Sequence, residues 1–166
     1  MKKSVVVIAL VVLSFAIAQN AMAQASATQS FNLAVNAVYK IATSGNPGAL
    51  TITTGTAGTN ALTSVTDATT NYSITQNFAS TVKITANLNT VLPAGYTLQI
   101  NLASVKGTSA GTVDISATTP ASAASVVTAI ALGADANKTI TYTFGALASA
   151  GVLTSTAKTV TLTLTN

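Results

Sequence analysis

Apolar and polar residues alternate along several stretches of this chain, and many of the polar positions are threonine. The alternation runs through 96–102, 138–144 and 158–165, and it recurs over 82–88. A period of two places successive side chains on opposite faces of a β-strand, which is the pattern of a half-buried antiparallel sheet. Threonine, valine and isoleucine also favour the pleated surface of a sheet. We therefore expect an all-β chain.

Five further ranges carry weaker strand patterns, and turn residues separate the strands. The weaker strands are expected over 31–41, 50–53, 72–76, 113–116 and 126–132. Turns are expected at 45–48, 92–95 and 106–107, a short helical turn within 146–152, and a surface excursion over 51–70. This spacing predicts an antiparallel sandwich of about seven to ten strands. Its predicted core face consists of Val82, Ile84, Leu88, Leu98, Ile100, Leu102, Ile140, Tyr142, Phe144, Val160, Leu162 and Leu164.

The N-terminus has the three parts of a secretory signal peptide. Lys2 and Lys3 precede an almost wholly apolar run over 4–18, and the small residues Ala21 and Ala23 follow it. As a helix this run would be about 22 Å long, shorter than the roughly 30 Å hydrocarbon core of a bilayer. We expect residues 1–23 to be removed. Residues 24–166 would then form a single β-sandwich domain without a membrane span, secreted by a bacterium to the cell surface or beyond, with the periplasm as the alternative.

Charged residues are scarce. The chain has seven lysines, three aspartates, and no arginine, glutamate or histidine, and without Lys2 and Lys3 the formal charge is +2. The remaining lysines are spread singly along the chain, whereas nucleic-acid binding needs clustered cations. We therefore expect no nucleic-acid partner. A low net charge also favours association between copies of a protein.

The residues that usually perform acid–base or nucleophilic chemistry are absent or isolated. There is no cysteine, so neither disulfides nor thiolate metal sites can form. Asp67 and Asp135 are expected in turns and Asp114 on a solvent-facing strand position, and the sequence after Asp135 lacks the ligand spacing of a calcium loop. We expect no enzyme activity and predict no catalytic, metal or cofactor-binding residue.

The range 31–41 is unusually long for a strand. Six of its residues share one parity and form a candidate subunit-contact strand: Phe31, Leu33, Val35, Ala37, Tyr39 and Ile41. At about 3.3 Å per residue the range spans some 36 Å, twice a typical strand. Either one strand bends and serves both sheets of its own domain, or part of it fills a groove in the next subunit. The second arrangement is the donor-strand complementation known in pilins.

Three motifs, LPAGYTL at 92–98, TITYTF at 139–144 and TLTLT at 161–165, accompany the leader and the N-terminal alternation. With them the chain resembles small secreted bacterial immunoglobulin-like β-sandwich proteins, many of them uncharacterised and some of them fimbrial or surface-layer components. The resemblance implies an immunoglobulin-like sandwich at or outside the cell envelope. The cysteine pair of chaperone–usher pilins is missing, so the resemblance does not extend to that assembly route.

These observations favour a secreted structural or adhesive protein that associates with itself or with other cell-surface proteins, as a fimbria-like or surface-layer subunit. The alternative is a small carbohydrate- or surface-binding module, for which Tyr72 and Phe78 are the expected exposed aromatic pair. A third hypothesis is ice binding. It requires the threonines of 139–143 and 159–165 to lie on neighbouring strands and form one grid.

Overall fold

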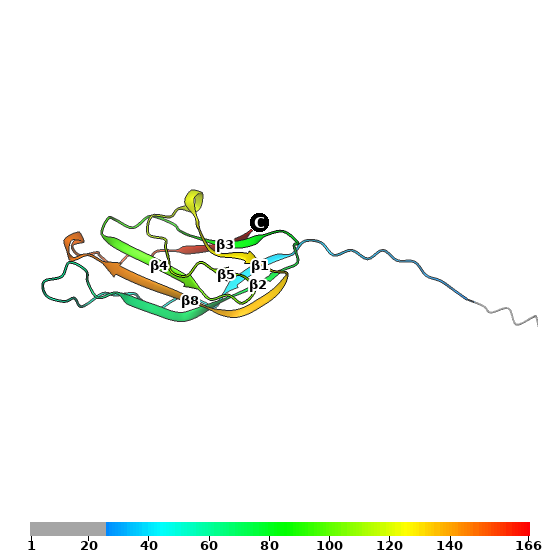
Figure 1. Cartoon of the computed structure of the whole chain (residues 1–166), viewed down its shortest axis with the longest axis horizontal. Helices are drawn as coiled ribbons and strands as arrows, with labels where there is room; N and C mark the ends of the chain where they lie inside the picture. The colour runs from blue at the N-terminus through cyan, green and yellow to red at the C-terminus, as the bar shows by residue number, and fades with distance from the viewer. Residues whose placement is uncertain (1–25) are drawn as a thin grey trace, which may run out of the picture. The chain divides into compact units, whose positions relative to one another are not determined.

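A computed structural model describes residues 26–166 (Figure 1), and the predicted signal peptide at 1–23 lies outside the described residues. Residues 36–166 form one unit, and the described part of the preceding unit, 26–35, contains no helix or strand. Nine strands and two short 3-10 turns make up the larger unit. The prediction of an antiparallel all-β sandwich is confirmed, because two antiparallel sheets pack against each other.

The two sheets contain five and four strands. The first has the order β1 (Tyr39–Thr43), β2 (Val65–Gln76), β8 (Gly133–Ala146), β4 (Tyr96–Leu102) and β6 (Val113–Asp114). The second has the order β5 (Thr108–Ser109), β7 (Ala124–Ile130), β3 (Val82–Leu88) and β9 (Val160–Thr165). The strands that are longest and most regularly patterned in sequence occupy the sheet interiors, with the exception of β9.

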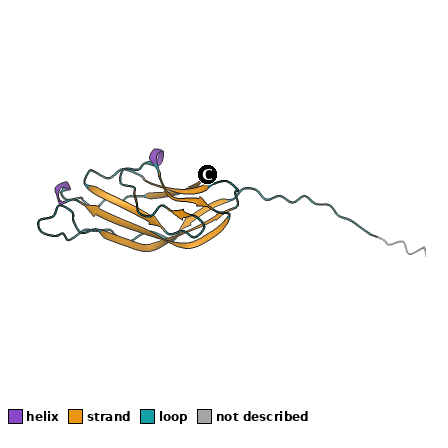
Figure 2. Cartoon of the chain, viewed as in Figure 1, coloured by secondary structure: helices purple, strands orange, loops and turns teal. Residues whose placement is uncertain are grey.

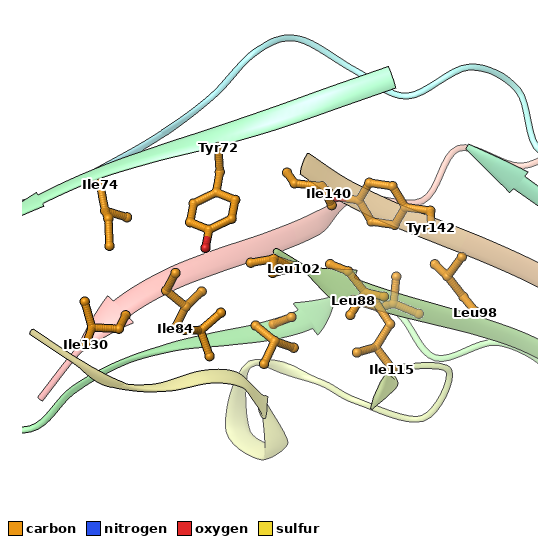
Figure 3. Close-up of a cluster of buried hydrophobic side chains, with 14 of the residues drawn as sticks. Tyr72, Ile74, Ile84, Leu88, Leu98, Leu102, Ile115, Ile130, Ile140 and Tyr142 are labelled. Carbon is orange, nitrogen blue, oxygen red and sulfur yellow. The ribbon is translucent and has the colours of Figure 1, made fainter. Parts of the chain in front are cut away.

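The core lies between the inner faces of the two sheets (Figure 3). Ile84 and Leu88 of β3 and Ile100 and Leu102 of β4 belong to this core, and all four side chains are fully buried. Burying a side chain of this size contributes about 1.5–3 kcal/mol, and in a chain without disulfides this burial is the main source of stability. Eight of the twelve predicted core residues are buried. The remaining four pack against the core half-buried: Phe144, Val160, Leu162 and Leu164.

The helical content is limited to two 3-10 turns, η1 (Pro120–Ser122) and η2 (Ala148–Ala150) (Figure 2). The second confirms the short helical turn expected within 146–152. Within residues 26–166, no helix has the length and apolar character needed to cross a membrane.

Three predicted elements differ from the structure. The surface excursion expected over 51–70 is wrong at its end, because β2 already begins at Val65. Its register against β8 shifts between Asp67 and Thr70, and this bulge hides the alternation on which the prediction relied. The strand expected over 50–53 does not form. The 31–41 strand is shorter than expected, because β1 contains only Tyr39–Thr43.

The start of β1 is determined by the side chain of Asn77. Its amide oxygen accepts a hydrogen bond from the Val38 N–H (2.6 Å), and its amide nitrogen donates to the Asn36 carbonyl (2.9 Å). The Asn77 N–H also donates to the Val38 carbonyl (3.2 Å). These main-chain groups are thus bonded outside a strand ladder, and the pairing with β2 begins only at Tyr39. The expectation that one long strand bends to serve both sheets is therefore wrong.

Candidate subunit-contact site

The segment 26–35 follows an extended path (Figure 1), and its apolar side chains are exposed. Phe31 is 75% exposed, Leu33 86% and Val35 87%. Residues of one parity thus present three large apolar groups to solvent, while Asn32 and Ala34 occupy the other parity. Single exposed apolar residues are common, but three at strand spacing in an uncharged segment form a strand-like apolar face.

The six residues of the predicted contact strand separate into two groups. Phe31, Leu33 and Val35 lie in the segment 26–35, and Ala37 is exposed just ahead of β1. Tyr39 and Ile41 belong to β1 and pack half-buried against the core. The Tyr39 ring lies 5.2 Å from that of Phe78, centroid to centroid, at an interplanar angle of 45°. The second group is therefore used within its own sandwich.

Two edge strands lie together along one side of the sandwich. In the described part of the chain, β1 has a ladder partner on one side alone, β2, and β9 on one side alone, β3. Strands with a free edge carry unpaired N–H and C=O groups that can accept another strand. Between the two edges lies a groove of about 400 Å³. We call this the edge groove.

Apolar side chains from both sheets line the edge groove. Ile41 from β1 and Val160 and Leu162 from β9 are half-buried there, and Tyr142 of β8 contributes its ring. Burial raises the pKa of the Tyr142 phenol, and the Asp67 carboxylate adds to the rise. The edge groove therefore presents incompletely covered core residues beside polar ones.

Polar side chains share the lining of the edge groove with the apolar ones: Thr43, Asn46, Thr70, Lys158, Thr159 and Thr161. Thr70 of β2 is 3% exposed, and its hydroxyl is the one buried side-chain oxygen of residues 26–166 without a hydrogen-bond partner. Lys158 is the only charged residue in the lining, and its ammonium group donates to the Thr90 hydroxyl at 2.7 Å. The lining contains no carboxylate.

The opposite side of the sandwich has much shorter edges. There, β5 and β6 contain two residues each. The Ser109 hydroxyl of β5 donates to the Asn101 side chain of β4 at 3.3 Å, which links the two sheets. Very short edge strands are one way in which proteins prevent strand addition. The long free edges are therefore concentrated at β1 and β9.

The carboxylates of Asp114 and Asp67 accept hydrogen bonds from nearby groups. Asp114 is exposed, as expected, and accepts from the Ser116 N–H at 2.8 Å. Asp67 lies in the β2 bulge and not in a turn. Its carboxylate accepts a hydrogen bond from the Thr69 N–H, and this bond lowers the pKa of the carboxyl below its usual value. The Thr69 hydroxyl and the Gly48 N–H also lower this pKa, while partial desolvation raises it. Among residues 26–166, no three metal-ligating side chains gather.

Asp135 is buried in β8 rather than placed in a turn. One carboxylate oxygen accepts from the Val105 N–H (2.9 Å) and the Lys106 N–H (3.1 Å), and the other lies 3.1 Å from the Lys138 ammonium nitrogen. Burial is the largest influence on its pKa and raises it, but these three donors together outweigh burial and lower the pKa. Asp135 therefore anchors the loop that joins β4 to β5.

Two predicted surface features are not present. Tyr72 is 1% exposed, with its hydroxyl donating to the Ala103 carbonyl at 2.7 Å, and Phe78 is half-buried. The predicted exposed aromatic pair for a sugar is therefore wrong. The threonines of 139–143 lie on β8 in the first sheet and those of 161–165 on β9 in the second, so they form no common grid.

Comparison with protein-family models, curated proteins and solved structures found no match for this chain. The edge groove was missed by the sequence reasoning. The alternation of 158–165 correctly indicates which side chains face inward, but alternation does not distinguish an edge strand from a central one.

Proposed function

We propose that this chain is a secreted structural or adhesive subunit that assembles with copies of itself, and that its N-terminal segment is the assembling element. The observation that carries the proposal is the exposure of Phe31, Leu33 and Val35 on one face of an extended segment. Covering an apolar side chain of this size contributes about 1.5–3 kcal/mol, so a partner that covers all three has a large driving force.

The charge distribution supports association between identical chains. Between Gln24 and Tyr39 the sequence contains no charged residue. The part that follows residue 23 has a formal charge of +2, so electrostatic repulsion between copies is weak. An uncharged, strand-like segment and a weakly charged domain both favour association between copies.

The test is the assembly state of the chain that begins at Gln24, measured by size-exclusion chromatography and negative-stain electron microscopy. We expect oligomer ladders or filaments. A triple variant, Phe31→Ser with Leu33→Ser and Val35→Ser, should remain monomeric with an unchanged circular dichroism spectrum. The matched control, Asn32→Ser with Ala34→Ser, changes the opposite parity of the same segment and should still assemble. Wild-type chain that stays monomeric as its concentration is raised would contradict the proposal.

A further inference from the structure

The free edge of β9 lacks the usual protection against strand addition. Natural edge strands are commonly short, charged, interrupted by proline or bulged. β9 (Val160–Thr165) has six residues, none of them charged or proline, and it pairs with β3 through all six positions in an unbroken register. Lys158 precedes the strand, and its ammonium group bonds to Thr90. The whole length of this edge is therefore available to another strand.

The inward side chains of β9 are incompletely covered. Val160, Leu162 and Leu164 are half-buried, whereas their β3 partners Leu88, Ala86 and Ile84 are fully buried. The difference arises because β3 has a neighbouring strand on both sides and β9 on one. A strand added beside β9 would cover these residues and the edge groove together.

The segment 31–35 has the side-chain spacing and the lack of charge that a strand added beside β9 would need. Alternate residues of an extended strand are separated by about 6.6 Å, so Phe31, Leu33 and Val35 repeat at the same interval as Val160, Leu162 and Leu164. The segment is uncharged, and the edge groove has a single charged lining residue. A charged segment would lose the hydration of its charges on entering such a groove, which is unfavourable. The segment 31–35 has no charge, so its binding does not carry this cost.

We propose that the acceptor for the N-terminal segment is the edge groove of a second copy of this chain, where residues 31–35 add to the free edge of β9 as a fifth strand of the second sheet. This inference rests on the proposed function. Phe31, Leu33 and Val35 then cover Ile41, Tyr142 and Leu162, while Asn32 and Ala34 face outward beside Thr161 and Thr163.

The absence of cysteine allows a direct test by disulfide trapping. One chain that begins at Gln24 carries Asn32→Cys, and a second, size-tagged chain with the same start carries Thr161→Cys or Thr163→Cys. With Leu33 opposite Leu162, Asn32 lies opposite Thr161 in a parallel pairing and opposite Thr163 in an antiparallel one. Paired cross-strand residues have Cβ separations of about 4.5–5.5 Å, which is within reach of disulfide formation. The matched control is Thr108→Cys, an exposed threonine on β5, the opposite edge strand of the same sheet.

We expect the mixed disulfide dimer to form at one of the two β9 positions at least tenfold faster than at position 108. Crosslinking at neither β9 position, or equal crosslinking at all three, overturns the edge groove as acceptor. Assembly of the unmodified chain is followed in parallel by size-exclusion chromatography. Oligomers without a β9 crosslink reject this acceptor and leave the proposed function standing, whereas absence of oligomers rejects both.

Discussion

Asp135 and Lys138 lie three positions apart on β8, yet their side chains meet on the same side of the sheet, 3.1 Å apart. Residues three apart in a regular strand point to opposite faces. Here Asn137 has a positive φ of 53°, and the register against β2 places Tyr72 opposite Lys138 but Ile74 opposite Asp135. This bulge, with the Asn137 N–H donating to the Ser73 hydroxyl at 3.0 Å, brings the two charges together.

Replacing the buried carboxylate should therefore destabilise the fold. Asp135→Asn keeps one acceptor oxygen but removes the charge that faces two backbone N–H groups and Lys138. We expect the free energy of unfolding to fall by about 2 kcal/mol, measured by urea denaturation, because charge-assisted hydrogen bonds contribute more than neutral ones. The control Asp114→Asn alters an exposed carboxylate and should stay within about 0.5 kcal/mol of wild type. Equal effects of the two changes would contradict the anchoring role of Asp135.

Stability should decrease in acid. The pKa values of Asp67 and Asp135 are both lowered in the folded state. Their contribution is therefore complete above the unfolded-state pKa of about 3.9, and it is lost as pH falls through the folded-state values. With no histidine in the chain, little change is expected between pH 5 and 8. Urea denaturation at pH 7, 5 and 3 measures this, and the pH 3 loss should be smaller in Asp135→Asn. A midpoint that falls already between pH 7 and 5 would contradict the assignment.

At the floor of the edge groove, Thr70→Val should stabilise the sandwich. The substitution preserves the β-branched shape and removes a buried hydroxyl that has no hydrogen-bond partner within residues 26–166. Leaving such a group unpaired costs about 1–3 kcal/mol, so we expect a gain of about 1 kcal/mol by thermal or urea unfolding. Thr66→Val is the control, because the exposed Thr66 hydroxyl is hydrogen-bonded to that of Thr143 at 3.1 Å and should give no gain. A loss of stability in Thr70→Val would indicate that its hydroxyl is satisfied.

Assembly through the N-terminal segment should depend only weakly on ionic strength. The segment is uncharged and the edge groove contains one lysine, so there are few charge–charge interactions between them for salt to screen. We expect a similar oligomer fraction in about 0.05 M and 0.5 M sodium chloride by analytical ultracentrifugation, and a larger fraction in ammonium sulfate, which strengthens apolar burial. Dissociation by sodium chloride would instead indicate an interface held by ion pairs.

The central strands could be predicted from sequence because their alternation is complete. Ile100 and Ile140 follow the period of two and are buried as expected. Tyr72 was misplaced because its strand carries Gln76 on the core face. That amide is buried, donating to the Ile130 carbonyl and accepting from the Phe78 N–H, so a polar residue there does not mark a solvent-facing position.

The candidate site could be predicted only on the donor side. The alternation of Phe31, Leu33 and Val35 follows from local sequence, whereas their exposure is known only from the structure and the acceptor depends on which strand lies at a sheet edge. That position is decided by long-range pairing, since β9 joins β3 across more than seventy residues. Alternation in 158–165 is as regular as in 138–144, yet one range forms an edge and the other a centre.

The hydrogen bonds of Asn77 allow the N-terminal end of β1 to resist a pulling force. A chain pulled at residue 36 transmits tension first to the Asn36 and Val38 bonds with Asn77, and then along the β1–β2 ladder from Tyr39 to Thr43. When the pull runs along the axis of β1, the ladder bonds lie across it, so they are sheared together rather than opened one at a time. A subunit held by its N-terminal segment would thus resist extension through the Asn77 hydrogen bonds and the β1–β2 ladder, without any covalent crosslink.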